Sequence, residues 1–88
     1  MEIGLIVYSR AGRDQGSYYA VVEIVDESTV KIADGDQRRI KNAKTKNVKH
    51  LQSTGDVLEK IAQKIKNGTQ VFDQELFSAL RFYNENKE

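Results

Sequence analysis

The sequence predicts a mainly β domain, a small five-stranded barrel followed by two short helices that pack on it. Up to about residue 52, short apolar runs alternate with turn residues, which is typical of strands. From residue 53 onward the apolar residues recur at helical spacing instead. A chain of 88 residues fits one domain with a single modest core. We therefore expect the barrel (residues 1–52) and the helical pair (residues 53–88) to form one folding unit.

The first two strands are predicted to form a hairpin with a charged tip. Apolar runs at residues 3–8 and 18–25 flank a turn at residues 12–16, which reads Gly-Arg-Asp-Gln-Gly. Val, Ile and Tyr are enriched in strands because they pack well on a pleated surface. Glycine supplies the positive φ that tight connections often need, so we predict positive φ for at least one of Gly12 and Gly16.

Three further strands are predicted at Thr29–Ala33, Arg38–Ile40 and Asn47–Leu51, with a polar link at residues 41–46. Five short strands joined by turns predict a barrel of the SH3-like kind, in which closure reduces the exposed edges. Both faces of the first two strands are largely apolar, and a barrel interior uses only one of them. We therefore expect the helices to cover the second face.

The first helix is predicted from an apolar stripe within residues 57–65. It starts near Asp56, or one turn earlier with Ser53 or Thr54 as the cap. Gly68 ends it, because glycine can adopt the left-handed conformation that follows a last helical turn.

The second helix is predicted to begin at Asp73, a good N-cap, with Phe72 stapled onto Phe77. It runs to about Tyr83, and its apolar face consists of Leu76, Phe77, Leu80 and Tyr83. Two short amphipathic helices cannot bury such stripes alone, so they are expected to pack on each other and on the barrel.

The composition excludes several functional classes. The absence of cysteine excludes disulfides, thiolate metal sites and thiol catalysis. Residues 1–8 include an acid and are too short an apolar run for a signal peptide or a membrane span, so we expect a cytoplasmic protein. The net charge of +1 alone argues against a protein that coats itself in nucleic acid. The charge is concentrated, however, because residues 38–50 hold six basic residues and no acid.

The first half of the chain resembles the KOW motif, with a glycine, a Val-rich strand, Ala-Gly-Arg-Asp-Gln-Gly and a second Val-rich strand in that order. The resemblance covers residues 2–52 and continues through residues 32–35, 38–40 and 48–51. This part of the chain is similar to KOW-type ribosomal proteins of the archaeal and eukaryotic large subunit, and to small bacterial relatives described as RNA-binding. The resemblance implies a non-catalytic, ribosome-associated role in translation, with ribosomal RNA as the partner.

The chain departs from this family at two positions. Gln15 stands where the family often has a lysine before the second glycine, which removes one expected phosphate contact at the tip. Ala43 follows Asn42 where the family often has a proline, which loosens the basic segment. KOW modules bind both RNA and proteins, so the alternative function is a protein-interaction module that docks a ribosomal, transcription or translation protein.

The basic run is the main candidate for RNA binding, because Lys and Arg bind phosphates by charge and a strand projects alternate side chains from one face. A solvated surface of ordinary lysines is the alternative, and the lack of acids favours RNA. Charge removal at Arg39, Lys44 and Lys46 together is expected to leave thermal stability nearly unchanged, because exposed charges contribute little to folding. Arg13 at the tip either contacts RNA or solvates the turn, and Asp14 is expected only to bond its own backbone. The candidate RNA-binding residues are Arg10, Arg13, Arg38, Arg39, Lys41, Lys44, Lys46, Lys49 and His50.

No catalytic residue, metal site or cofactor is predicted. His50, the only histidine, has no His, Cys or acidic cluster near it in the sequence, which favours an RNA contact or simple packing. Asp34 and Asp36 lack the remaining ligands of a calcium loop. The turn at residues 12–16 lacks the Lys-Ser/Thr of a Walker loop.

The tyrosines of the hairpin are expected to be mainly packing residues, with at most one of them exposed to stack on an unpaired base. They are Tyr8, Tyr18 and Tyr19. We expect a monomer that contacts RNA and ribosomal proteins but no membrane.

Overall fold

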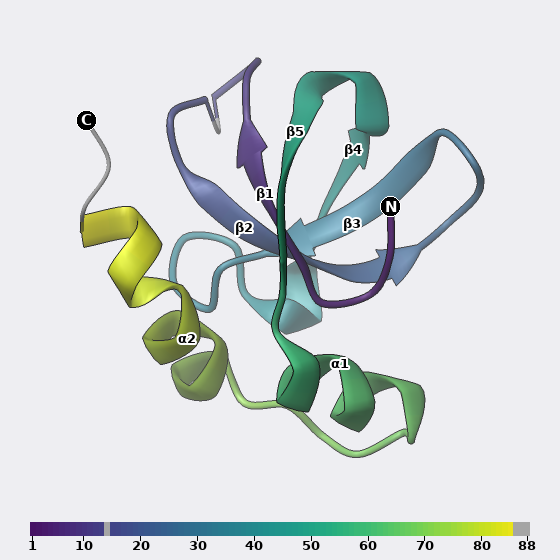
Figure 1. Ribbon diagram of the computed structural model, residues 1–88, viewed down its shortest axis with the longest axis vertical. Coiled ribbons are helices and arrows are strands. Elements are labelled where there is room, and N and C mark those ends of the chain that lie inside the picture. The colour runs from purple at the N-terminus through teal and green to yellow at the C-terminus, as the bar shows by residue number, and fades with distance from the viewer. Residues whose placement is uncertain (14, 86–88) are drawn as a thin grey trace.

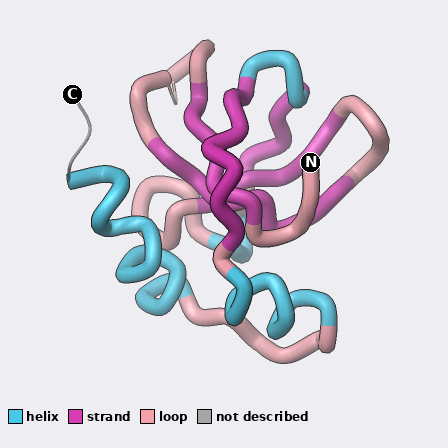
Figure 2. The backbone as a smooth tube through the Cα atoms, in the orientation of Figure 1, coloured by secondary structure: helices cyan, strands magenta, loops and turns pink. Residues whose placement is uncertain are grey.

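The computed structural model describes residues 1–13 and 15–85 and consists of a five-stranded antiparallel sheet and two C-terminal helices (Figure 1). The strand order is β4-β3-β2-β1-β5. Figure 2 shows both helices on the same side of the sheet. The elements in chain order are β1 (Leu5–Ser9), β2 (Tyr18–Ile24), β3 (Thr29–Ala33), the short helical turn η1 (Ile40–Asn42), β4 (Lys44–Asn47), a second helical turn η2 (Val48–His50), β5 (Leu51–Val57), α1 (Glu59–Lys66) and α2 (Asp73–Glu85).

The sheet curls but does not close into a hydrogen-bonded ring. β4 and β5 form its two edges, and no ladder joins them within the described residues. The curl brings residues of one face together, some of them from strands that are not neighbours. Val7 of β1, Ile32 of β3 and Leu51 of β5 belong to one buried cluster. Irregular register in the β1–β5 and β2–β3 ladders adds to the bend. The expected closed barrel is therefore observed only as a curled, open sheet.

Apolar side chains fill both faces of this sheet. Along β1, Leu5 and Val7 point into the curl, whereas Ile6 between them points toward the helices. The inner core consists of Leu5, Val7, Tyr19, Val21, Val30, Ile32 and Leu51. The outer core, between sheet and helices, consists of Ile6, Ala20, Ala33, Ile61, Leu76 and Leu80. The prediction that the helices cover a second apolar face is confirmed.

The strand predictions are right in the first half of the chain and wrong in the basic run. The strand Thr29–Ala33 has the predicted bounds. The predicted strand at residues 38–40 is a turn leading into η1, and the predicted link at residues 41–46 contains most of β4. The predicted strand at residues 47–51 contains η2, and β5 continues to Val57, where a helix was expected. The sequence does not predict β4, because this segment has no alternation of apolar and polar residues. It forms a strand because it pairs with β3.

The predicted turn conformations are confirmed, because φ is +78° at Gly12, +92° at Gly16 and +75° at Gly68. The predicted cap of α1 is wrong. α1 begins at Glu59 after Leu58, with no side-chain cap, because residues 53–57 belong to β5. No helix in the described ranges has the length and apolar character needed to cross a membrane.

The expected staple at the start of α2 is also wrong. Phe72 is 60% exposed and Phe77 is 40% exposed. Asp73 does begin the helix, but its Oδ1 accepts a hydrogen bond from the backbone N of Ile40 at 2.8 Å. The start of α2 is therefore joined to η1, and Glu75 in its first turn accepts a hydrogen bond from the backbone N of Phe72 at 3.4 Å.

Close backbone contact joins the turn after β3 to α2. Gly35 has φ +81°, and a Cβ built on it would lie 2.1 Å from the carbonyl oxygen of Asp73 and 2.8 Å from the N of Phe77. Any side chain at Gly35 would therefore displace the first turn of α2.

Candidate nucleic-acid interface

The end of β1 and the turn η2 form one basic surface. Ser9 pairs with Leu51, which places Arg10 beside η2. The backbone N of Arg10 donates to the carbonyl of His50 at 2.9 Å, and its guanidinium donates to the carbonyl of Lys49 at 3.0 Å. The hairpin tip and η2 consequently lie at the same end of the molecule (Figure 1).

The exposed cations at this end come from two distant parts of the sequence. Arg10, Arg13 and Lys49 are exposed, and His50 is half-buried. We call these four residues the tip surface. An acidic boundary adjoins it, because the N of Val48 donates to the carbonyl of Ser28 in the β2–β3 turn, which contains Asp26 and Glu27. Asp14, also at the tip, lies outside the described residues.

Lys46 is not part of the exposed surface, which corrects the expectation for this residue. It lies opposite Val30 in the ladder, so its side chain leaves β4 on the face of the inner core. It is 9% exposed, and its Nζ donates to the carbonyl of Ala11 at 2.8 Å. The hydrogen-bonded ammonium is held beneath the hairpin turn, because a buried charge needs a polar partner.

The other candidate cations lie apart from the tip surface. Lys44 is half-buried at the start of β4. Arg38 is half-buried, and its backbone N donates to Oδ1 of Asp34 at 2.9 Å. Arg39 and Lys41 are exposed at η1. Because β4 separates η1 from η2, the basic run of the sequence is divided between two places and does not form one strand face.

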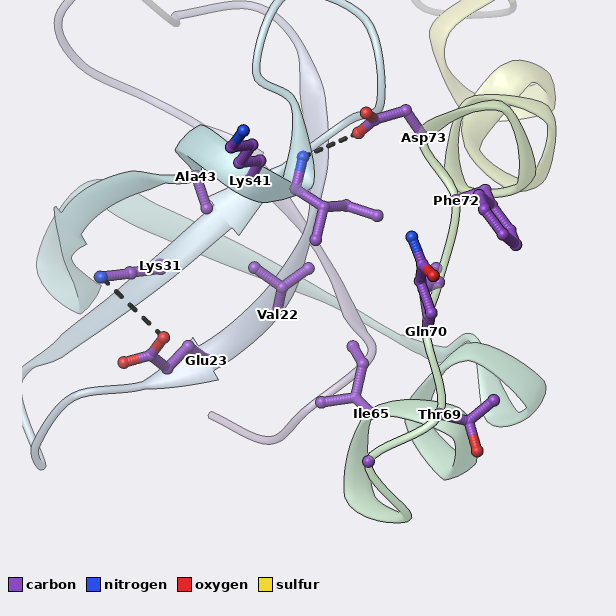
Figure 3. Close-up of a pocket in the computed structure, with 13 residues that line it drawn as sticks. Val22, Glu23, Lys31, Lys41, Ala43, Ile65, Thr69, Gln70, Phe72 and Asp73 are labelled. Atoms are coloured by element: carbon purple, nitrogen blue, oxygen red, sulfur yellow. Dashed lines mark hydrogen bonds and ion pairs between the residues drawn. The ribbon is translucent and has the colours of Figure 1, made fainter.

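A cavity lies between the sheet, η1 and the segment that joins the helices (Figure 3). Its volume is about 680 Å³, and Val22 and Ile65 supply apolar walls. Glu23 and Lys31 pair at 3.9 Å on one side. Sequence reasoning missed this cavity, because it depends on how residues 68–73 cross the outer face of the sheet.

A row of aromatic rings borders the tip surface on the outer face of the sheet. The ring centroids of Tyr8 and Tyr18 are 5.0 Å apart, and those of Tyr18 and Tyr83 are 5.4 Å apart. The amide of Asn84 accepts from the N of Tyr18 at 2.9 Å and donates to its carbonyl at 3.2 Å. Tyr8 and Tyr18 are half-buried, whereas Tyr19 is fully buried in the inner core.

Polar contacts hold the helices in place behind this row. The hydroxyl of Tyr83 donates to Asp56 at the end of β5, and this bond raises the pKa of Tyr83 above its ordinary value of 10.0. Lys64 of α1 donates to Glu75 of α2 at 2.5 Å, which lowers the pKa of Glu75. These contacts are structural, since each ties one element to another.

The chemistry available at the tip surface is the binding of anions. Within residues 1–13 and 15–85, no group of three or more His, Cys, Asp or Glu side chains could hold a metal ion. No protein-family model matches the chain, and no curated protein matches its sequence. The geometry of the site is therefore what bears on its function.

Proposed function

We propose that this chain is a non-catalytic, cytoplasmic RNA-binding protein of the KOW type that binds structured RNA, by resemblance ribosomal RNA, through the tip surface. The observation that carries the proposal is the contact of Arg10 with η2. It brings Arg10 of the hairpin beside Lys49 and His50 of the basic run. Exposed arginine and lysine side chains suit phosphates, which dominate the affinity of proteins for nucleic acids.

We also propose that the curled sheet is an SH3-like barrel of the KOW kind. The bond from Lys46 to Ala11 supports this, because it connects the edge strand β4 to the turn between β1 and β2. β4 is not a neighbour of β1 in the sheet, so this bond forms across the curl, whereas a closed barrel would also join β4 to β5 by a strand ladder.

The tip surface is expected to read RNA through its phosphates and its shape. A-form RNA offers side chains a deep, narrow major groove and a wide minor groove, so sequence preference in duplex regions is small. Arg10 and Arg13 can each pair with phosphate oxygens through a planar fork of donors. Lys49 adds a point charge beside them.

The salt dependence of RNA binding tests this proposal. With three to four phosphate contacts, the log–log slope of affinity against salt is about −3, from roughly 0.7–0.9 per contact. The double substitution Arg13→Gln with Lys49→Gln removes two of these contacts, so the slope falls in magnitude by about 1.4–1.8. The matched control, Arg39→Gln with Lys41→Gln at η1, leaves the slope unchanged.

Two results would contradict this proposal. If the control pair flattens the slope and the tip pair does not, RNA contacts η1 and the tip surface is the wrong site. A flat salt dependence in the unaltered protein contradicts electrostatic RNA binding altogether.

One observation favours the second candidate function, a protein-interaction module. Phe72, 60% exposed, belongs to the lining of the large cavity shown in Figure 3. Exposed aromatic side chains beside a cavity are common anchors in protein interfaces. Crosslinking in cells with sequencing of bound RNA separates the two functions. Recovery of protein partners without enrichment of RNA would favour the interaction module.

A further inference from the structure

A small cavity lies on the outer face of the sheet, where β1, β2 and β5 meet. It has a volume of about 290 Å³ and is lined by Tyr8, Tyr18, Gln52, Ser53 and Thr54. Tyr8 is the ladder partner of Tyr18 on one side and of Gln52 on the other. Partners in a ladder share one face of the sheet, so these three side chains form a row across β2, β1 and β5.

We infer that this cavity binds an unpaired base of RNA, with Tyr8 and Tyr18 as the stacking platform. The inference rests on the proposed function, and it adds a second kind of contact to it. Both tyrosines are half-buried and line the cavity, and stacking on an aromatic face binds any unpaired base. The tilt of 60° between the two rings gives the cavity two aromatic walls at an angle.

Gln52 supplies the polar group that a base edge needs. Its side chain is exposed, and it makes no hydrogen bond to any part of the chain that the structure describes. A glutamine amide carries both donors and an acceptor, so it can pair with the edge of a base that stacks on Tyr8.

The stacking platform is fixed before any ligand arrives. Both backbone groups of Tyr18 are bound by the Asn84 amide, and its ring also contacts the ring of Tyr83. A rigid platform loses little conformational entropy on binding. The arrangement therefore favours a binding role over loose surface packing.

The cavity and the tip surface are continuous along the chain. Tyr8 is two residues before Arg10, and Gln52 is two residues after His50. A base held at the cavity places its own backbone phosphates toward Arg10. The expected ligand is thus a junction, in which a paired segment ends and an unpaired nucleotide follows.

Two RNA probes test the inference, a blunt duplex and the same duplex with a single-stranded uridine overhang. The unaltered protein is expected to bind the overhang RNA more tightly than the blunt one. Tyr8→Leu, which keeps the apolar bulk and removes the ring, should weaken binding of the overhang RNA about tenfold and leave the blunt duplex unaffected. Tyr8→Phe is the matched control and should keep the preference, because it keeps the ring.

A second measurement reports the stacking directly. The chain has no tryptophan, so Tyr8→Trp places a single indole in the cavity. Its fluorescence should be quenched by the overhang RNA and not by the blunt duplex. Thermal melting of each variant verifies that the fold is intact.

The outcomes separate the two proposals. Equal affinity of the unaltered protein for both RNAs, or equal weakening of both by Tyr8→Leu, overturns the base site while RNA binding at the tip surface stands. Binding of neither RNA overturns the proposed function, and the base site with it.

Discussion

The ammonium of Lys46 donates a hydrogen bond to the carbonyl of Ala11 at 2.8 Å, and so a side chain of β4 reaches the turn that follows β1. The two segments are 35 residues apart in the sequence. Gly12 beside this bond has no side chain, and a Cβ there would lie 3.1 Å from the ammonium. The hairpin turn thus rests on a lysine that the sequence places among RNA-binding candidates.

Lys46→Met is expected to destabilise the protein by about 1.5–3 kcal/mol, because it removes a hydrogen bond from a charged donor beneath the turn. Lys44→Met, on the same face of β4 but half-buried, is the control and should change the free energy of unfolding by less than about 0.5 kcal/mol. Denaturant unfolding measures both. Equal small effects would show that Lys46 behaves as an ordinary surface lysine.

Gly35→Ala is expected to destabilise the protein by more than about 1–2 kcal/mol, the cost of a left-handed conformation for an L-residue alone. The added Cβ would also lie 2.1 Å from the carbonyl oxygen of Asp73. Gly55→Ala isolates the conformational cost, because φ there is +84° and no heavy atom lies within 4 Å of the added Cβ. If the two variants unfold at the same denaturant concentration, the turn after β3 does not press on α2.

Leu80→Ala is expected to destabilise the protein by about 2–5 kcal/mol, since Leu80 is 1% exposed in the outer core. Phe72→Ala removes a larger side chain that is 60% exposed, and it should change stability by less than about 0.5 kcal/mol. Thermal or denaturant unfolding compares them. A near-zero effect of Leu80→Ala would place that face of α2 in solvent.

The hydroxyl of Tyr83 makes stability depend on pH in the alkaline range. Its bond to Asp56 raises the pKa of Tyr83 above 10.0 in the folded protein. The stabilisation is therefore fully present below pH 10.0 and is lost as the pH rises through the folded pKa. In denaturant unfolding, Tyr83→Phe should be less stable than the unaltered protein at neutral pH, and the difference should shrink above pH 10.0. A difference that stays constant with pH would contradict the role of this bond.

The parts of the fold that apolar periodicity specifies could be predicted from the sequence. The alternation of Leu5, Ile6 and Val7 indicates two buried faces, and both are filled. β4 could not be found in this way, because Lys44 to Asn47 contain no apolar residue and are a strand only through pairing with β3. A sequence pattern places lysines at the surface. The burial of Lys46 could be predicted only by knowing that the carbonyl of Ala11 lies next to it in the fold, and no local pattern shows this.

The residues of the candidate site could be predicted from the sequence, but which of them lie together in the fold could not. Arg10 and Lys49 were both candidates, but only the pairing of Ser9 with Leu51 brings them together. The same register separates them from Arg39 and Lys41 at the other end of β4. Register depends on contacts between distant segments, and the sequence pattern specifies it weakly where a strand is polar.

The amide of Asn84 has a consequence for self-association. It hydrogen-bonds both the backbone N–H and the backbone carbonyl of Tyr18, as a neighbouring strand would. Open sheets carry unpaired edge groups that another molecule can extend into an intermolecular sheet. At the first residue of β2, the end of α2 already fills that position, so a strand from a second molecule finds no free backbone there.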